Sequence, residues 1–188
     1  MVLHQREQPL GAVTTRLAVA DDALCLSVLA IQVFLDTYAT DGIRPTLARE
    51  VLSAYSQASF GKAIAGARAR VIVAEHAGHM IGFAQVTFPA GHALAPQGVQ
   101  AELLRLYVQE PFTGCRVGTT LLAEAESLAL DAGATVTWLT PWAHNHRALA
   151  FYARRGYHDY GLTHFTFETE SHENRVLAKH LRPATNAA

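Results

Sequence analysis

The stretch that decides the fold reads VQEPFTGCRVGTTLL and covers residues 108–122. It joins the end of an apolar strand pattern to a loop, and the loop to the start of a helix pattern, with glycines at positions 114 and 118. A helix N-terminus carries unpaired N–H groups and the positive end of the helix dipole, and glycines let a bulky anion approach the backbone. The stretch therefore predicts a backbone cradle for a pyrophosphate group.

Strand-to-helix turns with two glycines also occur for purely structural reasons, so this stretch alone leaves that alternative open. It fits the two common nucleotide-binding motifs poorly. No Lys-Ser or Lys-Thr pair follows Gly118, as a P-loop requires, and the spacing G-x-G-x-x-G is absent. The cradle thus belongs to another class of site.

A second pattern lies downstream, where residues 145–157 read NHRALAFYARRGY. Together the two stretches resemble the GNAT acetyltransferases. In that family the cofactor loop after the fourth strand reads Arg/Gln-x-x-Gly-x-Gly/Ala, and a later helix reads N-x-x-A-x-x-F-Y-x-x-x-G-F/Y. The two motifs occur here in the family's order, with one helix and one strand between them. The resemblance covers about residues 15–181, and residues 102–157 carry the specific motifs.

The cofactor loop departs from the family pattern at two positions. In the family register, which falls on residues 113–118, Thr113 replaces the usual Arg or Gln, and Arg116 replaces the first glycine. The Arg116 side chain could add a cation beside the pyrophosphate, but its Cβ could also crowd the backbone approach. These two residues are therefore expected to change the affinity for the cofactor relative to the family pattern.

The resemblance implies acetyl-CoA as the co-substrate and assigns its contacts. Main-chain groups of Leu106 and Val108 should pair with the pantetheine amides, with a backbone N–H orienting the acetyl carbonyl. Asn145 should contact the pantetheine arm or a bound water. The residues expected to contact acetyl-CoA are Leu106, Tyr107, Val108, Thr113, Gly114, Cys115, Arg116, Val117, Gly118, Thr119, Asn145, Phe151 and Tyr152.

The resemblance also suggests two catalytic residues. It places the Tyr152 phenol near the thioester sulfur, where it could act as a general acid for the departing thiolate. The alternative is that Phe151 and Tyr152 only pack the helix into the core. Glu102 could take the proton of the acceptor amine, through a water. Its alternative roles are a solvated residue at a strand end or a partner for Arg105.

Periodicity predicts further strands and helices on both sides of this stretch. Strands are expected at 15–19, 70–75, 80–88, 102–108, 136–139, 163–169 and 175–181. Helices are expected after the caps Asp21 and Asp22, from Thr46 onward, over 117–132 and over 146–155. The first helix should bury Leu24, Val28, Ile31, Leu35 and Tyr38, and Gly61 and Gly66 should interrupt the chain after the second helix.

This order of elements indicates an α/β fold, with a mixed sheet and helices on both faces. The GNAT resemblance adds that the central sheet is mostly antiparallel and splays apart between its fourth and fifth strands. One domain is expected over 15–182. Turn formers and small residues predict loose termini at 1–14 and 183–188.

Composition excludes several classes of protein. Half of the 188 residues are hydrophobic and 16% are charged, which is typical of a globular chain. The net charge of −1, with interspersed signs, provides no footprint for nucleic acid or an anionic membrane. No apolar run is long enough to span a bilayer, and residues 1–12 lack the apolar core of a signal peptide. Cys25 and Cys115 lie far apart, which fits a reducing cytoplasm.

Ten histidines raise the question of a metal site. His144 and His146 flank Asn145, and His76 and His79 flank an expected turn, but no recognised ligand set accompanies them. No metal is expected. An acyl-enzyme on Cys115 would need a nearby base, which is not apparent, so direct attack by the amine is favoured.

Acceptor specificity is expected from the first two helices and the last strand pair, which wall the substrate groove in the family. Residues 34–38 read FLDTY and resemble a pattern in branches that act on polyamines and other small amines. Asp36 and Asp41 could attract a cationic amine. The alternative is that both are ordinary solvated residues at a helix end.

These patterns predict an acetyl-CoA-dependent N-acetyltransferase that acts on the primary amine of a small molecule in a ternary complex. One alternative is a non-catalytic acyl-CoA sensor, suggested by Thr113 and Arg116, and another is acetylation of a protein or peptide. The expected partners are acetyl-CoA and an amine acceptor, without nucleic acid or membrane, and a homodimer is left open.

Overall fold

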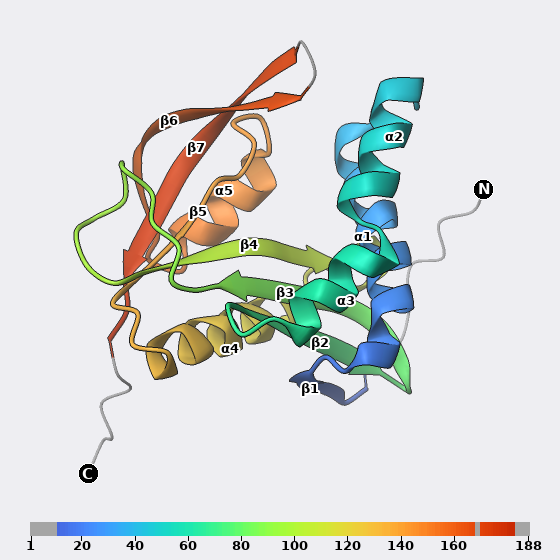
Figure 1. Cartoon of the computed structure of the whole chain (residues 1–188), viewed down its shortest axis with the longest axis horizontal. Coiled ribbons are helices and arrows are strands. Elements are labelled where there is room, and N and C mark those ends of the chain that lie inside the picture. Colours follow the sequence, from blue (N-terminus) through green and yellow to red (C-terminus); the bar gives the residue numbers. More distant parts are fainter. Residues whose placement is uncertain (1–10, 168–169, 183–188) are drawn as a thin grey trace. The chain divides into compact units, whose positions relative to one another are not determined.

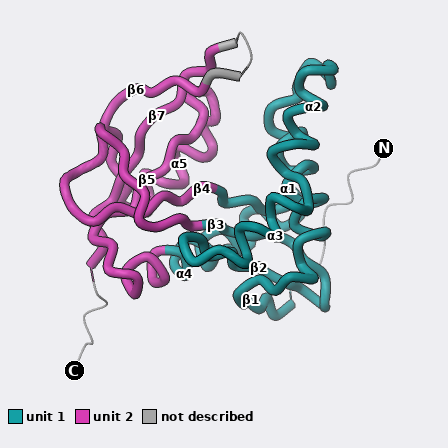
Figure 2. Tube along the Cα trace, viewed as in Figure 1, with its two compact units in different colours: residues 1–85, 105–125 teal, residues 86–104, 126–188 magenta. Residues whose placement is uncertain are grey.

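The computed structural model describes residues 11–167 and 170–182. The chain forms two compact units, one of residues 1–85 and 105–125 and the other of residues 86–104 and 126–188 (Figure 2). The tails expected to be loose lie largely outside the described residues, as does Thr169 at the end of an expected strand.

The strands follow one another in the hydrogen-bonding order β1-β2-β3-β4-β5-β7-β6 (Figure 1). Strands β3 and β4 run through both units. The strands are β1 (Val13–Leu17), β2 (Ala69–His76), β3 (His79–Thr87), β4 (Gln100–Val108), β5 (Val136–Leu139), β6 (His158–Phe167) and β7 (Glu170–His180). The helices are α1 (Ala23–Tyr38), α2 (Pro45–Ala54), α3 (Gln57–Ala65), α4 (Val117–Asp131) and α5 (His146–Ala153). Short 3-10 turns cover Ala20–Asp22 and Glu110–Phe112.

The sheet is mixed, as predicted. β1 pairs with β2, β5 with β7 and β6 with β7, all antiparallel, whereas β4 and β5 are parallel. The parallel pairing is short, because it joins Gln100–Glu102 to Val136–Trp138 and goes no further along β4. The two strands therefore part after Glu102, which confirms the expected splay.

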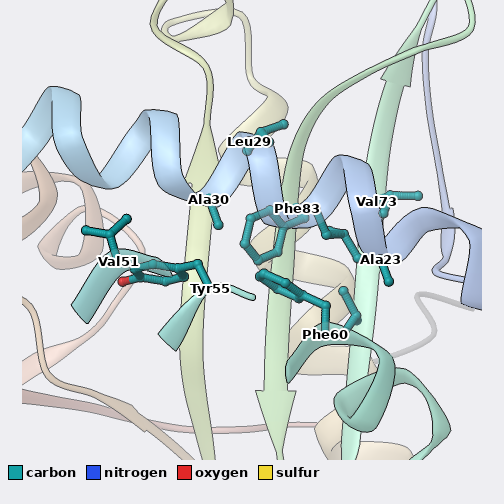
Figure 3. Packing of buried hydrophobic residues seen from close by; sticks show 10 residues of the cluster. Ala23, Leu29, Ala30, Val51, Tyr55, Phe60, Val73 and Phe83 are labelled. Carbon is teal, nitrogen blue, oxygen red and sulfur yellow. The ribbon is translucent and has the colours of Figure 1, made fainter. Parts of the chain in front are cut away.

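In the first unit, helices cover one face of the strands with an aromatic core (Figure 3). Val71, Val73 and Phe83 on the strands pack with residues of α1, α2 and α3, and the rings of Phe60 and Phe83 meet edge to face at 5.5 Å. Ile72 and Ala74 alternate with these valines and are also buried, so the opposite face is covered too. The hydroxyl of Thr15 on β1 donates to Glu124 on α4.

The predicted buried face of α1 is confirmed at Ile31 and Leu35, which pack against the core, and is wrong in the first half of the helix. Leu24 and Val28 are 56% and 60% exposed, and the buried side carries instead Ala23, Leu26, Ser27, Leu29 and Ala30. This helix has apolar residues on both sides, so a spacing of three and four residues fits either face. Small residues at 23, 27 and 30 let the helix approach its neighbours closely, and Ser27 donates a 2.6 Å hydrogen bond to the carbonyl of Tyr55.

Other boundaries were predicted with mixed success. Strand β5 and the starts of α4 and α5 are confirmed. Two residues with positive φ, Ala77 and Gly78, connect β2 to β3, as a tight hairpin requires. Gly66 ends α3, but Gly61 lies inside that helix, so the predicted break there is wrong. β1 begins and ends two residues earlier than expected.

The last hairpin is much longer than predicted. Residues 170–174 are polar and were expected to link two strands, but they belong to β7 and pair with β6, for example Asn174 with Thr163. Ladder hydrogen bonds rather than an apolar pattern hold this part of the hairpin, so periodicity could not detect it.

Candidate functional site

The turn between β4 and α4 has the backbone geometry of an anion cradle. After the 3-10 turn, Gly114 has φ 77° and Arg116 has φ 65°, both in the left-handed region, and α4 begins at Val117. The turn is anchored at its start, because Thr113 donates through its N–H and its hydroxyl to the carbonyl of Glu110 at 3.1 and 2.8 Å. Successive N–H groups around such left-handed residues form a concave nest for anions.

The N–H groups of this turn are open. Within the described part of the chain, none of the backbone N–H groups of residues 114–118 donates a hydrogen bond. The first N–H of the helix with a partner is that of Thr119, which donates to the carbonyl of Arg116 at 2.9 Å. Five consecutive donors at the positive end of a 15-residue helix are therefore available to an anionic ligand.

Arg116 has a left-handed backbone at the position where the family pattern has its first glycine. Its positive φ is uncommon for a residue with a Cβ, yet it keeps the turn in the conformation that exposes the N–H groups. The side chains of Cys115 and Arg116 are exposed, and that of Arg116 makes no hydrogen bond or ion pair with a described residue. The turn therefore also carries an exposed cation that is not paired with a described carboxylate.

The end of β4 also exposes backbone groups. Gln109 donates its N–H to the carbonyl of Ile81 on β3 at 3.0 Å. Because alternate residues of a strand point their backbone groups to opposite sides, those of Leu106 and Val108 face away from β3. This is the part of β4 beyond its pairing with β5. Tyr107 differs, because its side chain packs into the aromatic core.

Asn145 caps helix α5. Its Oδ1 accepts a 3.0 Å hydrogen bond from the N–H of Ala148. Its Nδ2 group donates to no described residue. One end of the side chain therefore holds the helix, and the other end remains for a ligand or a water.

Tyr152 lies on the buried side of α5. It is 7% exposed, and its ring meets those of Phe151 and Tyr157 edge to face at 5.1 and 5.5 Å. Phe151 also packs under the guanidinium of Arg155, 3.9 Å from the ring centre. Both aromatic rings are thus held by packing, which fits the predicted core role of Phe151 and gives the Tyr152 phenol a defined orientation.

Glu102 lies on β4 at the last residue that pairs with β5, opposite Trp138. Its side chain is half-buried, between the buried Ala101 and Leu103. Arg105, considered above as its partner, donates its hydrogen bond to Gln85. The predicted base therefore stands where the two strands separate.

The sequence analysis missed a polar group in the core of the first unit. The hydroxyls of Tyr55 and Tyr107 lie 3.0 Å apart, and the guanidinium of Arg105 lies 5.1 Å from the centre of the Tyr55 ring. Burial raises the pKa of Tyr107 well above its ordinary value, and burial also raises the pKa of Tyr55, so both phenols keep their protons at neutral pH. Tyr55 and Tyr107 are 52 residues apart, and no local pattern joins them.

The residues that could attract cations or metals are less organised. Asp36 and Asp41 are exposed. His144 and His146 are exposed, with ring centres 6.5 Å apart. Among residues 11–167 and 170–182, no group of three or more His, Cys, Asp or Glu side chains could hold a metal ion. None of the helices described is both long and apolar enough to cross a membrane.

Comparisons with known proteins agree with this geometry. The model of the acetyltransferase (GNAT) family matches residues 38–157. An uncharacterised N-acetyltransferase of Mycobacterium tuberculosis is 25% identical over 142 residues, which are 73% of this chain and 86% of that protein.

Solved structures show the same fold. PaiA N-acetyltransferase from Thermoplasma acidophilum, in complex with coenzyme A, is 21% identical and superposes with a TM-score of 0.73, covering 90% of this chain and 99% of that chain. YncA from Salmonella typhimurium, a putative acetyltransferase with its cofactor acetyl-CoA, is 17% identical with a TM-score of 0.63, covering 95% and 98% of the two chains.

Proposed function

Because this chain belongs to the GNAT family of N-acetyltransferases and uses acetyl-CoA, we propose that it acetylates the primary amine of a small molecule. The observation that carries the proposal is the run of five open N–H groups at residues 114–118. A pyrophosphate is the part of acetyl-CoA that such a run of donors suits.

Both backbone and side-chain groups would bind the cofactor. Gly114, Cys115, Val117 and Gly118 would contribute N–H groups, and Arg116 would add its guanidinium. Leu106 and Val108 would offer main-chain groups from the side of β4 that faces away from β3. Asn145 would donate from Nδ2, the end of its side chain that the helix cap leaves unused.

When bound, acetyl-CoA supplies an acetyl thioester that the nitrogen of a deprotonated amine can attack directly in a ternary complex. We assign Glu102 as the group that accepts the amine proton, through a water, and the Tyr152 phenol as the group that donates a proton to the departing sulfur. Two observations support these assignments. Glu102 stands where β4 leaves β5, and the Tyr152 ring is fixed between Phe151 and Tyr157.

The two cysteines also bear on the cellular setting of the proposal. Cys25 and Cys115 are free thiols, and both are exposed. Exposed free thiols persist in a reducing compartment, so we place the protein in the cytoplasm. Cell fractionation with a tagged chain would test this, and recovery in a secreted or membrane fraction would contradict it.

The test of the proposed activity is thiol release from acetyl-CoA with a panel of polyamines, aminoglycosides, amino acids and short peptides. Buffer hydrolysis of acetyl-CoA is the baseline. We expect the rate of thiol release to rise above this baseline with a small amine. A higher rate with peptides alone would indicate that the acceptor is a protein rather than a small molecule. A flat panel, together with tight acetyl-CoA binding by calorimetry, would favour a sensor and overturn the proposal.

A further inference from the structure

Arg105 is a half-buried cation that lacks an acidic partner. Its guanidinium donates to Oε1 of Gln85, on the neighbouring strand, and lies over the rings of Tyr55 and Phe60 at 5.1 and 5.5 Å. Within the described part of the chain it forms no ion pair with a carboxylate. Glu50 acts on Tyr55 electrostatically but makes no ion pair with Arg105.

Three other cations in the described part of the chain pair with carboxylates. Arg16 donates to Asp22 and Glu75, with 2.6 Å contacts to each. Arg175 pairs with Asp159 and Lys179 pairs with Glu126, both at 2.7 Å. Buried charge is costly unless it is paired. The half-buried Arg105 guanidinium has only neutral partners among the described residues, namely the Gln85 amide, the Tyr55 hydroxyl and two rings, so it is suited to an anion from outside the chain.

The groups around Arg105 are hydrogen-bond donors. A guanidinium has five N–H donors, and Arg105 uses them for Gln85 and for the Tyr55 hydroxyl, so donors remain. The hydroxyls of Tyr55 and Tyr107 share one hydrogen bond, which leaves one phenol hydrogen for a further acceptor. Because burial raises the pKa of both phenols, they are donors rather than anions at neutral pH. A carboxylate placed here would meet donors of complementary charge.

Arg105 belongs to the same unit as the cofactor cradle and lies on the strand that leads toward it. Arg105 lies three residues before the end of β4 at Val108, roughly 10 Å along a strand. Its side chain contacts the ring of Tyr55, which follows α2, and the ring of Phe60 on α3, so it lies on the face of β4 that these helices cover. The anion site is therefore separate from the N–H groups that would hold the pyrophosphate.

We propose that Arg105, with the Tyr55 and Tyr107 hydroxyls, binds a carboxylate of the acceptor, which is therefore an amine that also carries a carboxylate, as an amino acid does. This inference rests on the proposed function and narrows it. This inference disfavours polyamines as acceptors, because Arg105 would repel their second cationic group. Asp36 and Asp41, which could attract such a group, are exposed residues outside this cluster. Arg105 is a specificity residue and takes no part in proton transfer.

The experiment uses matched pairs of amines that differ only in the carboxylate, namely several amino acids and the amines formed by their decarboxylation. For each pair, the ratio of kcat/KM values is measured with the full chain. We expect the wild-type protein to favour the amino acid about 10- to 100-fold, the worth of a hydrogen bond to a charged group. No preference, or a preference for the decarboxylated amine, would overturn the inference.

Three variants test whether Arg105 causes the preference for the amino acid. Arg105→Gln should reduce the ratio to about one, chiefly by raising the KM of the amino acid, whereas Arg105→Lys should keep part of it because the charge remains. Lys62→Gln removes a cation from an exposed position on α3 in the same unit and should leave the ratio unchanged. Each ratio compares two substrates of one preparation, so partial unfolding of a variant does not alter it.

The outcomes separate this inference from the proposed function. If small amines are acetylated with the same kcat/KM whether or not they carry a carboxylate, the inference is wrong and the proposed function still holds. An equal loss of kcat/KM on both members of a pair in Arg105→Gln would show that Arg105 only supports the packing of Tyr55 and Phe60, and would also remove the inference. Absence of acetylation with every amine would remove both.

Discussion

The turn at residues 113–118 and the helix segment at residues 145–157 present opposite cases. The turn departs from the family pattern at Thr113 and Arg116, yet its backbone has two left-handed residues and five open N–H groups. The helix segment matches the family pattern, but two of its motif side chains already have structural roles within the fold. Asn145 caps the helix, and Tyr152 is buried between two rings.

The difference shows what each kind of site demands of the sequence. A cradle built from backbone N–H groups depends on φ and ψ angles, so a residue that accepts the left-handed conformation can replace glycine. A site built from side chains depends on residue identity, but the same residues can also serve packing and capping. A match to a side-chain motif can therefore reflect either a role in the site or a role in packing and capping. Mutation can separate these two roles.

The largest effect is expected for the phenol of Tyr152. Tyr152→Phe should lower kcat about 100- to 1,000-fold, because a general acid contributes on that scale, while the Kd of coenzyme A stays within about twofold of wild type. Stopped-flow or steady-state thiol release and calorimetry measure the two quantities. Unchanged turnover would reduce Tyr152 to a packing residue.

Tyr157→Phe is the matched control for this experiment. The Tyr157 hydroxyl donates to Glu126 at 3.0 Å, and the same carboxylate binds Lys179 at 2.7 Å. Its loss should reduce the free energy of unfolding by about 2 kcal/mol, a typical value for a hydrogen bond to a charged group. Turnover per folded molecule should not change. A fall in turnover like that of Tyr152→Phe would show that both act through packing.

A smaller effect is expected at Arg116, where three variants divide the side chain from the backbone. Arg116→Gln and Arg116→Gly should each raise the Kd of coenzyme A about two- to fivefold, because both lose an exposed cation and keep the turn. Arg116→Val should raise it at least about tenfold, because a β-branched residue resists the left-handed conformation. Calorimetry at low and high salt measures these constants.

The salt series provides the control for the Arg116 variants. The advantage of wild type over Arg116→Gln should shrink at high salt, since screening weakens an exposed charge. The penalty of Arg116→Val should persist, since it comes from backbone conformation. Equal affinities of the Gln and Val variants would mean that the left-handed residue does not shape the cradle.

The smallest effect is expected at Asn145, where one side chain has two uses. Asn145→Ala should lower the free energy of unfolding by about 1 kcal/mol through loss of the cap, and should weaken coenzyme A binding a few-fold. Asn145→Asp keeps an oxygen for the cap and lacks the Nδ2 donor. It should retain stability in thermal unfolding and lose affinity only. Wild-type affinity in both variants would restrict Asn145 to capping.

The sequence alone predicted the parts of this fold that depend on local patterns. Strand β5, the start of α4 and the tight turn at Ala77 and Gly78 follow from short-range periodicity and turn chemistry, and the structure confirms them. The buried residues in the first half of α1 and the length of the β6–β7 hairpin were predicted incorrectly. Both depend on which neighbour a segment meets, because α1 is apolar on two sides and residues 170–174 are held by their pairing with β6.

For the site, sequence by itself determined the order of the motifs, and it predicted a cradle at the start of α4 and the residues that the family pattern assigns to acetyl-CoA. Only the tertiary structure decided that Arg116 adopts φ 65°, that Asn145 divides its side chain between two uses, and that Arg105 meets Tyr55 and Tyr107 without an acidic partner. The physical reason is distance along the chain. Motifs are local and can be read in order, whereas the burial and the partners of Arg105 depend on side chains about 50 residues away that only folding brings beside it.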